Sequence, residues 1–127
     1  MSDHRAILTA NAPAPVGPYS QAIRVDGFVF CSGQVGLDPA TGKIIDGGVG
    51  AQARQVLDNL AAVLAGAGLA LDAIVKTTIF LVDINDFAAV NAVYGERMGT
   101  PPPARSTVAV AALPLGARIQ IEAIAKV

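Results

Sequence analysis

Two charged side chains stand in segments that otherwise consist of uncharged residues, and the first of them is Arg105. It follows three prolines, and its neighbours are small or uncharged. A guanidinium can bind a carboxylate through two parallel hydrogen bonds, which fixes the plane of the ligand as well as its charge. Alternatively, Arg105 is a charge on an edge strand that discourages aggregation. Its position alone leaves both interpretations open.

The second is Glu122, one of only two glutamates, in a segment whose apolar alternation does not require a charge. A glutamate that faces a cleft can position and deprotonate a water molecule as a general base. Alternatively, Glu122 forms a structural ion pair, with Arg105 or Arg118 as the partner. Both interpretations remain open.

Four further residues are candidates for binding a ligand. Asn91 falls on the apolar face of an expected helix, so its amide either donates to a ligand or holds a loop or a neighbouring subunit. Tyr19 either stacks and hydrogen-bonds at a pocket mouth or anchors the N-terminal segment. Ser32 and Gly33 can bring a hydroxyl and a backbone N–H close to an anion.

The scarcity of cysteine and histidine limits the chemistry. The 127 residues include one cysteine, Cys31, and one histidine, His4. An internal disulfide, a zinc site of Cys and His, and a nucleophile activated by histidine are therefore excluded. We interpret Cys31 as a small buried apolar residue. We expect no metal and no cofactor.

The composition indicates a globular protein that forms oligomers. Hydrophobic residues make up 53% and charged residues 15%, with a mean hydropathy of +0.52, so apolar surface should be buried between subunits. The net charge of −1 and the scattered basic residues argue against nucleic acid as a partner. No apolar run approaches the roughly 20 residues that cross a bilayer, and no secretory signal is evident. We expect a cytoplasmic protein without a membrane partner.

The N-terminal part of the chain predicts a lead-in and a hairpin. Prolines in residues 1–18 predict an extended or turning segment, with the first regular structure after Pro18. Asp26-Gly27 lies between two apolar runs and predicts a hairpin with strands over residues 22–25 and 28–31.

A loop and a helix should follow. Residues 34–48 are dense in turn formers, and their length makes them a candidate binding loop. Apolar residues over 49–67 recur at helical spacing, and Gly66 and Gly68 supply the C-terminal stop.

The rest of the chain completes an α+β pattern. The β-branched run 74–82 predicts a strand. A helix capped by Asp83 or Asn85 should follow, with one apolar face formed by Phe87, Val90, Tyr94 and Met98. Two strands are expected over 104–110 and 118–126. The order β-β-α-β-α-β-β over residues 1–127 predicts one domain with two helices on one sheet face and another subunit against the other face.

Six stretches of the chain together resemble the reactive intermediate deaminase (Rid) family: NAPAPVGPYSQA, CSGQVGLDPATGKI, AQARQVLDNLAAVL, IVKTTIFLVDINDFAAVNAVY, PPPARSTV and IEAIA. The resemblance spans nearly the whole chain. It is nearest to the archetypal enamine/imine deaminase subgroup, whose arginine in an A-R-S string is present as Arg105 and whose glutamate before A-I-A is present as Glu122.

The resemblance implies a chorismate-mutase-like fold assembled as a homotrimer, with the sheets forming a central barrel and active sites between neighbouring subunits. It implies hydrolysis of 2-imino acids, the tautomers of 2-aminoacrylate and 2-aminocrotonate, to 2-keto acids and ammonia without a cofactor, which protects pyridoxal-phosphate enzymes. Arg105 would bind the substrate carboxylate and Glu122 would activate the attacking water. The pocket would be lined by Tyr19, Ser32, Gly33, Asn91 and Thr107.

Two positions depart from the family's pattern, since many relatives carry cysteine at Thr107 and an acidic residue at Gln120. We expect Thr107 to be tolerated, because the attacking water is not a thiol. The alternatives to the imine deaminase are a small-carboxylate-binding or interaction protein on the same scaffold and a 3-aminoacrylate deaminase. A ribonuclease or translation inhibitor is disfavoured by the lack of a basic groove and of a histidine base.

Overall fold

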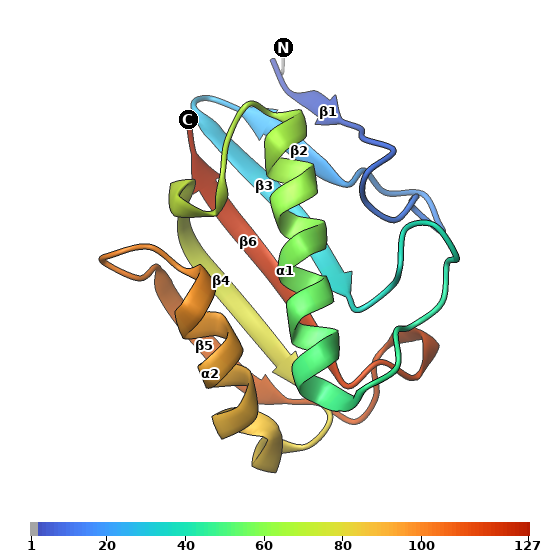
Figure 1. Ribbon diagram of the computed structural model, residues 1–127. Helices are drawn as coiled ribbons and strands as arrows, with labels where there is room; N and C mark the ends of the chain where they lie inside the picture. The colour runs from blue at the N-terminus through green and yellow to red at the C-terminus, as the bar shows by residue number, and fades with distance from the viewer. Residues whose placement is uncertain (1–2) are drawn as a thin grey trace.

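The computed structural model describes residues 3–127, whose six strands form one mixed sheet (Figure 1). The strand order across the sheet is β1-β2-β3-β6-β4-β5. All neighbouring pairs run antiparallel except β4 and β5, which are parallel. The strands are β1 (Arg5–Ile7), β2 (Ala22–Val25), β3 (Phe28–Val35), β4 (Ile74–Leu81), β5 (Ala104–Ala109) and β6 (Ile119–Lys126).

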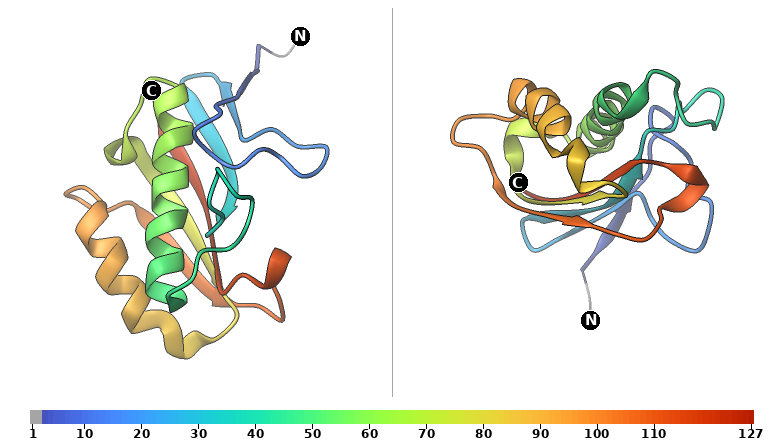
Figure 2. Two further views of the ribbon diagram at one scale, coloured as in Figure 1. Left: turned by 45° about the vertical axis from the view of Figure 1, so that its right-hand side comes forward. Right: turned by 90° about the horizontal axis from the view of Figure 1, so that it is seen from below.

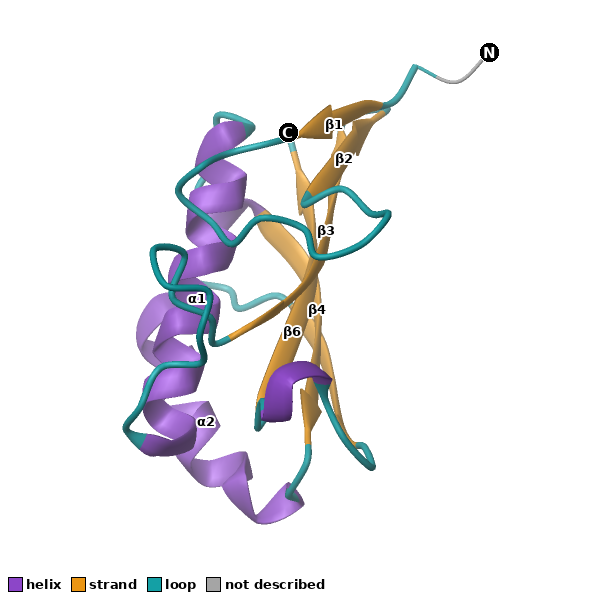
Figure 3. Cartoon of the chain, turned by 90° about the vertical axis from the view of Figure 1, so that its right-hand side faces the viewer, coloured by secondary structure: helices purple, strands orange, loops and turns teal. Residues whose placement is uncertain are grey.

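Both α-helices lie on the same face of the sheet, as Figures 2 and 3 show. They are α1 (Gly48–Gly66) and α2 (Phe87–Arg97), and short 3₁₀ segments occupy Leu71–Ala73, Ile84–Asp86 and Pro114–Gly116. The predicted α+β fold with two helices on one face is therefore confirmed. No helix within residues 3–127 is both long and apolar enough to cross a membrane.

The core lies between the helices and the facing side of the sheet. Fully buried apolar side chains at helical spacing on α1 meet those of the central strands β4 and β6. Each such side chain contributes roughly 1.5 to 3 kcal/mol relative to an exposed one. They include Val56, Leu57, Leu60, Val63 and Leu64 from α1, and Ile79, Leu81, Ile119 and Ile121 from the sheet.

Of the two glycines that were expected to end α1, only Gly68 does so. Gly68 has φ +77°, and its N–H donates to the Ala65 carbonyl while the Leu69 N–H donates to the Leu64 carbonyl. These are the bonds of a left-handed helix stop. Gly66 instead remains inside the helix.

The expectation that regular structure begins after Pro18 is wrong, because β1 forms an edge strand paired with β2. Three residues are too few to show an alternating pattern, so the sequence carried no signal for this strand. Beyond β1 the chain is held by the buried Gln21. Its carboxamide accepts from the Thr9 N–H at 2.8 Å and donates to the carbonyls of Thr9 and Pro13, both at 3.0 Å. These bonds fix the segment that leads to Tyr19.

The predicted hairpin is confirmed. Asp26 and Gly27 have φ values of +50° and +80°, which a tight turn between twisted strands requires. β3 continues past residue 31 to Val35, with a register shift against β6 between Cys31 and Gln34. The expected loop therefore starts later than residue 34. α1 and the later strands agree with their predicted bounds to within a residue. The expected cap of α2 is wrong, because Asp83 accepts from the Asn85 N–H and caps the 3₁₀ segment before α2, which itself begins after Asp86.

The sheet face away from the helices carries exposed apolar side chains. Phe28, Phe30 and Val108 alternate with buried or helix-facing residues on β3 and β5 and are between 37% and 44% exposed. This surface agrees with the expectation that another subunit covers this face, which stays a prediction.

Candidate active site

Arg105 and Glu122 lie on opposite faces of the sheet. Arg105 pairs with Thr77 of β4, and Glu122 pairs with the next residue, Thr78. Successive residues of a strand point to opposite faces, and Thr77 is buried against α2, where its hydroxyl lies 2.7 Å from the Tyr94 hydroxyl. Arg105 therefore faces the helices and Glu122 faces away from them. The two side chains of one chain do not meet in one pocket.

The face of α2 that meets the sheet holds the Arg105 side chain in place. The guanidinium carbon lies 5.4 Å from the ring centroid of Phe87 and 5.0 Å from that of Tyr94, and Nη1 donates to Asn91 Oδ1 at 2.9 Å. Phe87, Asn91 and Tyr94 are spaced four and three residues apart, so they share one side of the helix. Aromatic rings near a guanidinium stabilise its charge without using its donors.

The supported guanidinium borders open space. A cavity of about 320 Å³ is lined by Arg105, Asn91 and Tyr94 together with residues of the proline-rich segment that leads into β5. Asn91 is the one hydrogen-bond partner of the Arg105 guanidinium within residues 3–127, which leaves most of its five donors unused. β5 is an edge strand, as one interpretation required, and the side chain packs against Phe87 and Tyr94 of α2. Binding of a carboxylate by Arg105 stays a prediction.

Thr107 lies two residues after Arg105 on the same strand. Its hydroxyl oxygen is buried and has no hydrogen-bond partner among the described residues. It does not line the cavity beside Arg105. Its predicted contact with a substrate remains a prediction.

At strands β3 and β6, four of the predicted residues share a second cavity of about 460 Å³. Tyr19, Ser32, Gly33 and Glu122 line it, together with Gln120 and apolar residues from three loops. β3 and β6 bring these residues together although they are far apart in the sequence, because the two strands are neighbours in the sheet. The predicted site residues thus form two groups, one around Arg105 and one around Glu122.

Tyr19 anchors the N-terminal segment and also lines the cavity, while its contact with a ligand stays a prediction. Its side chain is half exposed at the cavity, and its hydroxyl accepts a hydrogen bond from the Val16 N–H at 3.3 Å. The Ser32 hydroxyl donates to the Ser20 carbonyl at 2.6 Å. Its proton is therefore engaged within the chain, which leaves the oxygen as a hydrogen-bond acceptor.

Gly33 allows a close approach of the Gln120 side chain. A Cβ at this position would lie 2.6 Å from the Gln120 Nε2. The absence of a side chain lets the Gln120 carboxamide pack over the β3 backbone, next to Glu122 on the same face of β6.

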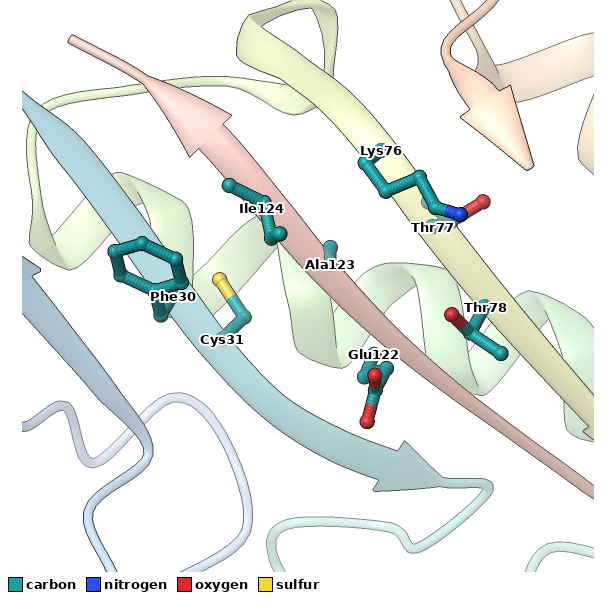
Figure 4. A pocket seen from close by; sticks show the side chains of 8 residues that line it. All are labelled: Phe30, Cys31, Lys76, Thr77, Thr78, Glu122, Ala123 and Ile124. Carbon is teal, nitrogen blue, oxygen red and sulfur yellow. The ribbon is translucent and has the colours of Figure 1, made fainter. Parts of the chain in front are cut away.

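Glu122 is exposed and forms no ion pair with any residue in 3–127. The interpretation of a structural ion pair with Arg118 or Arg105 is wrong, because one Arg118 nitrogen donates to both carboxylate oxygens of Asp86 at 2.9 Å. Figure 4 shows Glu122 on β6, with Thr78 on the neighbouring strand and a helix behind the sheet. Both side chains line a third hollow, of about 310 Å³. The Glu122 carboxylate is open to a ligand.

Cys31 is buried beside this group, and burial raises the pKa of its thiol to about 11. The thiol is therefore protonated at neutral pH, which confirms its interpretation as a small apolar residue. Across residues 3–127 no three side chains of His, Cys, Asp or Glu are grouped so as to hold a metal ion.

Two residues of these groups were not singled out from the sequence as site residues. Phe87 supports Arg105, and its spacing of four residues from Asn91 was the signal that could have shown it. Gln120 lines the Glu122 cavity, and it precedes Glu122 by two residues, which places both on one face of a strand.

Comparison with known proteins extends over nearly the whole chain. Residues 9–127 match the model of the family described as endoribonuclease L-PSP. A 2-iminobutanoate/2-iminopropanoate deaminase of goat (Capra hircus) is 51% identical over 95% of this chain and 88% of the relative. A RutC family protein of Pyrococcus horikoshii is 50% identical over 94% of each chain.

Solved structures with similar sequence identity have the same fold. The crystal structure of a Rid family protein of Yersinia pestis has a TM-score of 0.95 and 50% identity, covering 98% of this chain and 99% of that one. The family model matches residues 9–127, the relatives are about 50% identical, and the fold is shared with a solved Rid family structure. The chain therefore belongs to the reactive intermediate deaminase family.

Proposed function

We propose that this protein hydrolyses small 2-imino acids, such as 2-iminobutanoate and 2-iminopropanoate, to 2-keto acids and ammonia. The observation that carries the proposal is the Arg105 guanidinium, fixed by Phe87, Tyr94 and Asn91 with most of its donors unused. The name of the goat relative supports the same substrate class. Removal of these reactive compounds in the cytoplasm would protect pyridoxal-phosphate enzymes.

The residues supply what this reaction needs. Arg105 binds the substrate carboxylate and so fixes the position of the adjacent C=N carbon, which is already electrophilic. Glu122 takes a proton from a water molecule as the water oxygen bonds to that carbon and the C=N electron pair moves to nitrogen. The nitrogen takes up the proton held by Glu122 and then the proton that the new hydroxyl releases, and it leaves as ammonia while the hydroxyl oxygen becomes the keto oxygen. Neither a covalent nucleophile nor a redox step is involved.

The positions of the two charged residues bear on how subunits assemble around the site. Because Arg105 and Glu122 of one chain face opposite sides of the sheet, we infer that a site combines Arg105 of one subunit with Glu122 of another. A head-to-tail arrangement closes into a ring when the rotation between neighbouring subunits is a whole fraction of a full turn. A homotrimer with a chorismate-mutase-like central barrel satisfies it, with the apolar outer faces of the sheets, including Phe28, Phe30 and Val108, turned inward.

A coupled assay tests the function. A threonine dehydratase generates 2-iminobutanoate in place, and formation of 2-ketobutanoate is followed with and without this protein. The Arg105→Ala variant should lose at least about 30-fold in rate, on the scale for removing one partner of a desolvated charge pair. Glu122→Gln should lose about 100-fold or more, as expected for a general base.

The matched control is Arg97→Ala, which removes a surface arginine paired with Asp58 and should leave the rate unchanged. No acceleration by the intact wild-type assembly would refute the proposal. Carboxylate binding without turnover would then identify a binding protein, and turnover of 3-aminoacrylate alone would identify the other deaminase.

A further inference from the structure

A buried pair of hydroxyl groups joins α2 to the middle of the sheet. Thr77 of β4 is 1% exposed and Tyr94 of α2 is 5% exposed, and their hydroxyl oxygens lie 2.7 Å apart. Two hydroxyl groups at this distance form a hydrogen bond, so neither is left without a partner. Both side chains are buried by residues of their own chain, and burial of this kind is kept in any assembly.

The hydroxyl pair lies directly beside Arg105. Thr77 is the register partner of Arg105 on the neighbouring strand, and the Tyr94 ring centroid lies 5.0 Å from the guanidinium carbon. The Tyr94 ring is attached to α2 at one end, and its hydroxyl is bonded to β4 at the other. Because both ends are held, the ring cannot swing about its Cα–Cβ bond without breaking the hydrogen bond to Thr77.

Tyr94 differs from the other two side chains that contact the guanidinium, Phe87 and Asn91. Among the three, Tyr94 is the one that is buried within the chain itself. A long arginine side chain loses conformational freedom when it binds a ligand, and that loss weakens binding. A ring that is fixed in the core reduces this freedom before the ligand arrives.

Resting on the function proposed above, we propose that Thr77 is a positioning residue: its hydroxyl holds the Tyr94 ring, and the ring keeps the Arg105 guanidinium oriented for the substrate carboxylate. Thr77 does not line the cavity beside Arg105, so it acts through Tyr94. Without the hydroxyl bond the competent orientation of the guanidinium is less populated, and the apparent affinity falls by the same factor. Once the carboxylate is bound, the reacting carbon is placed as before, so kcat is retained.

Three variants remove the hydroxyl bond and keep the shapes of the side chains. Thr77→Val keeps a β-branched residue in the strand, Tyr94→Phe keeps the ring, and the double variant lacks both hydroxyl groups. An L-amino-acid oxidase with catalase supplies 2-iminobutanoate at graded steady concentrations, which give kcat and KM separately. Calorimetric titration gives the Kd for 2-ketobutanoate, the carboxylate product. We expect KM and Kd to rise about three- to tenfold in all three variants, with kcat within about twofold of wild type.

Stability measurements distinguish positioning from a merely structural role. Each single variant leaves one buried hydroxyl without a partner and should lower the midpoint of urea unfolding, whereas the double variant removes both groups and should recover most of that loss. The affinity should not recover with it. The matched control is Val63→Ala, at a fully buried valine of α1 away from Arg105, which should lower the midpoint and leave KM and Kd unchanged.

A return of KM and Kd to wild-type values in the double variant would overturn the proposal, since affinity would then follow stability alone. An equal rise in Val63→Ala, or a fall in kcat with KM and Kd unchanged, would also overturn it. If wild type binds 2-ketobutanoate but does not hydrolyse the imine, the proposed function fails, and the Kd values still decide the role of Thr77 toward a bound carboxylate. A wild-type protein that neither binds the keto acid nor hydrolyses the imine overturns both.

Discussion

Chains carrying Arg105→Ala and chains carrying Glu122→Gln should form active assemblies with each other, although each variant is inactive alone. In the proposed assembly each site combines an arginine from one subunit with a glutamate from the next, because these residues face opposite sides of the sheet. A Glu122→Gln chain still supplies Arg105, and an Arg105→Ala chain still supplies Glu122. One intact site forms wherever they meet in the correct order.

The expected recovery follows from counting junctions in a ring. A mixed trimer contains two chains of one variant and one of the other. In either composition a single junction joins an intact Arg105 to an intact Glu122, so specific activity should be about one third of wild type. A two-membered ring would give about one half, so the recovered fraction also reports the size of the assembly.

The assay requires assemblies that contain both chains. The two variants are co-expressed with different affinity tags, purified over both resins in succession, and measured with the dehydratase-coupled assay. Arg105→Ala chains bearing both tags serve as the control and should remain inactive. Mixed assemblies no more active than this control would refute the placement of the site between subunits.

Three further predictions concern stability. Thr107→Val should raise the free energy of unfolding by about 1 kcal/mol in urea titrations, because it removes a buried hydroxyl without a partner; a decrease would show that the hydroxyl is bonded. Burial raises the pKa of Cys31 from 9.0 to about 11, so the unfolded chain releases this proton at lower pH than the folded chain does. Stability should therefore be lost between pH 9 and 11, by roughly 2 to 3 kcal/mol in all, and Cys31→Ala should lack this loss. Gln21→Leu should accelerate amide hydrogen exchange in residues 9–13, whose carbonyls and N–H groups it binds, and unchanged exchange would contradict that role.

The sequence predicted the elements with strong local signals. The apolar spacing of α1 and the Asp26-Gly27 turn depend on neighbouring residues alone, and both are as expected. β1 could not be predicted, since its three residues owe their conformation to pairing with β2. Leu115 could not be predicted either, because its left-handed backbone opposes the preference of its side chain.

The sequence indicated which residues are candidates for the site. It did not indicate how these residues are arranged in space. Arg105 and Glu122 were found as charges in uncharged strands, and their opposite faces depend on strand order and register that no local pattern encodes. The same applies to Gln120, whose approach to Gly33 arises only when β6 lies next to β3.

The central position of β6 has a consequence for synthesis on the ribosome. β6 follows every other strand along the chain, yet it joins β3 to β4, and these two are not paired with each other. Until residues 119–126 have been translated, a nascent chain holds two separate pieces, β1-β2-β3 and β4-β5, each with an unpaired edge open to other chains. The last strand therefore joins the two pieces into one continuous sheet, in which only β1 and β5 remain as edges. In the same step it brings Glu122 beside Ser32 and Gly33, so a chain that stops before β6 lacks both the sheet and the site.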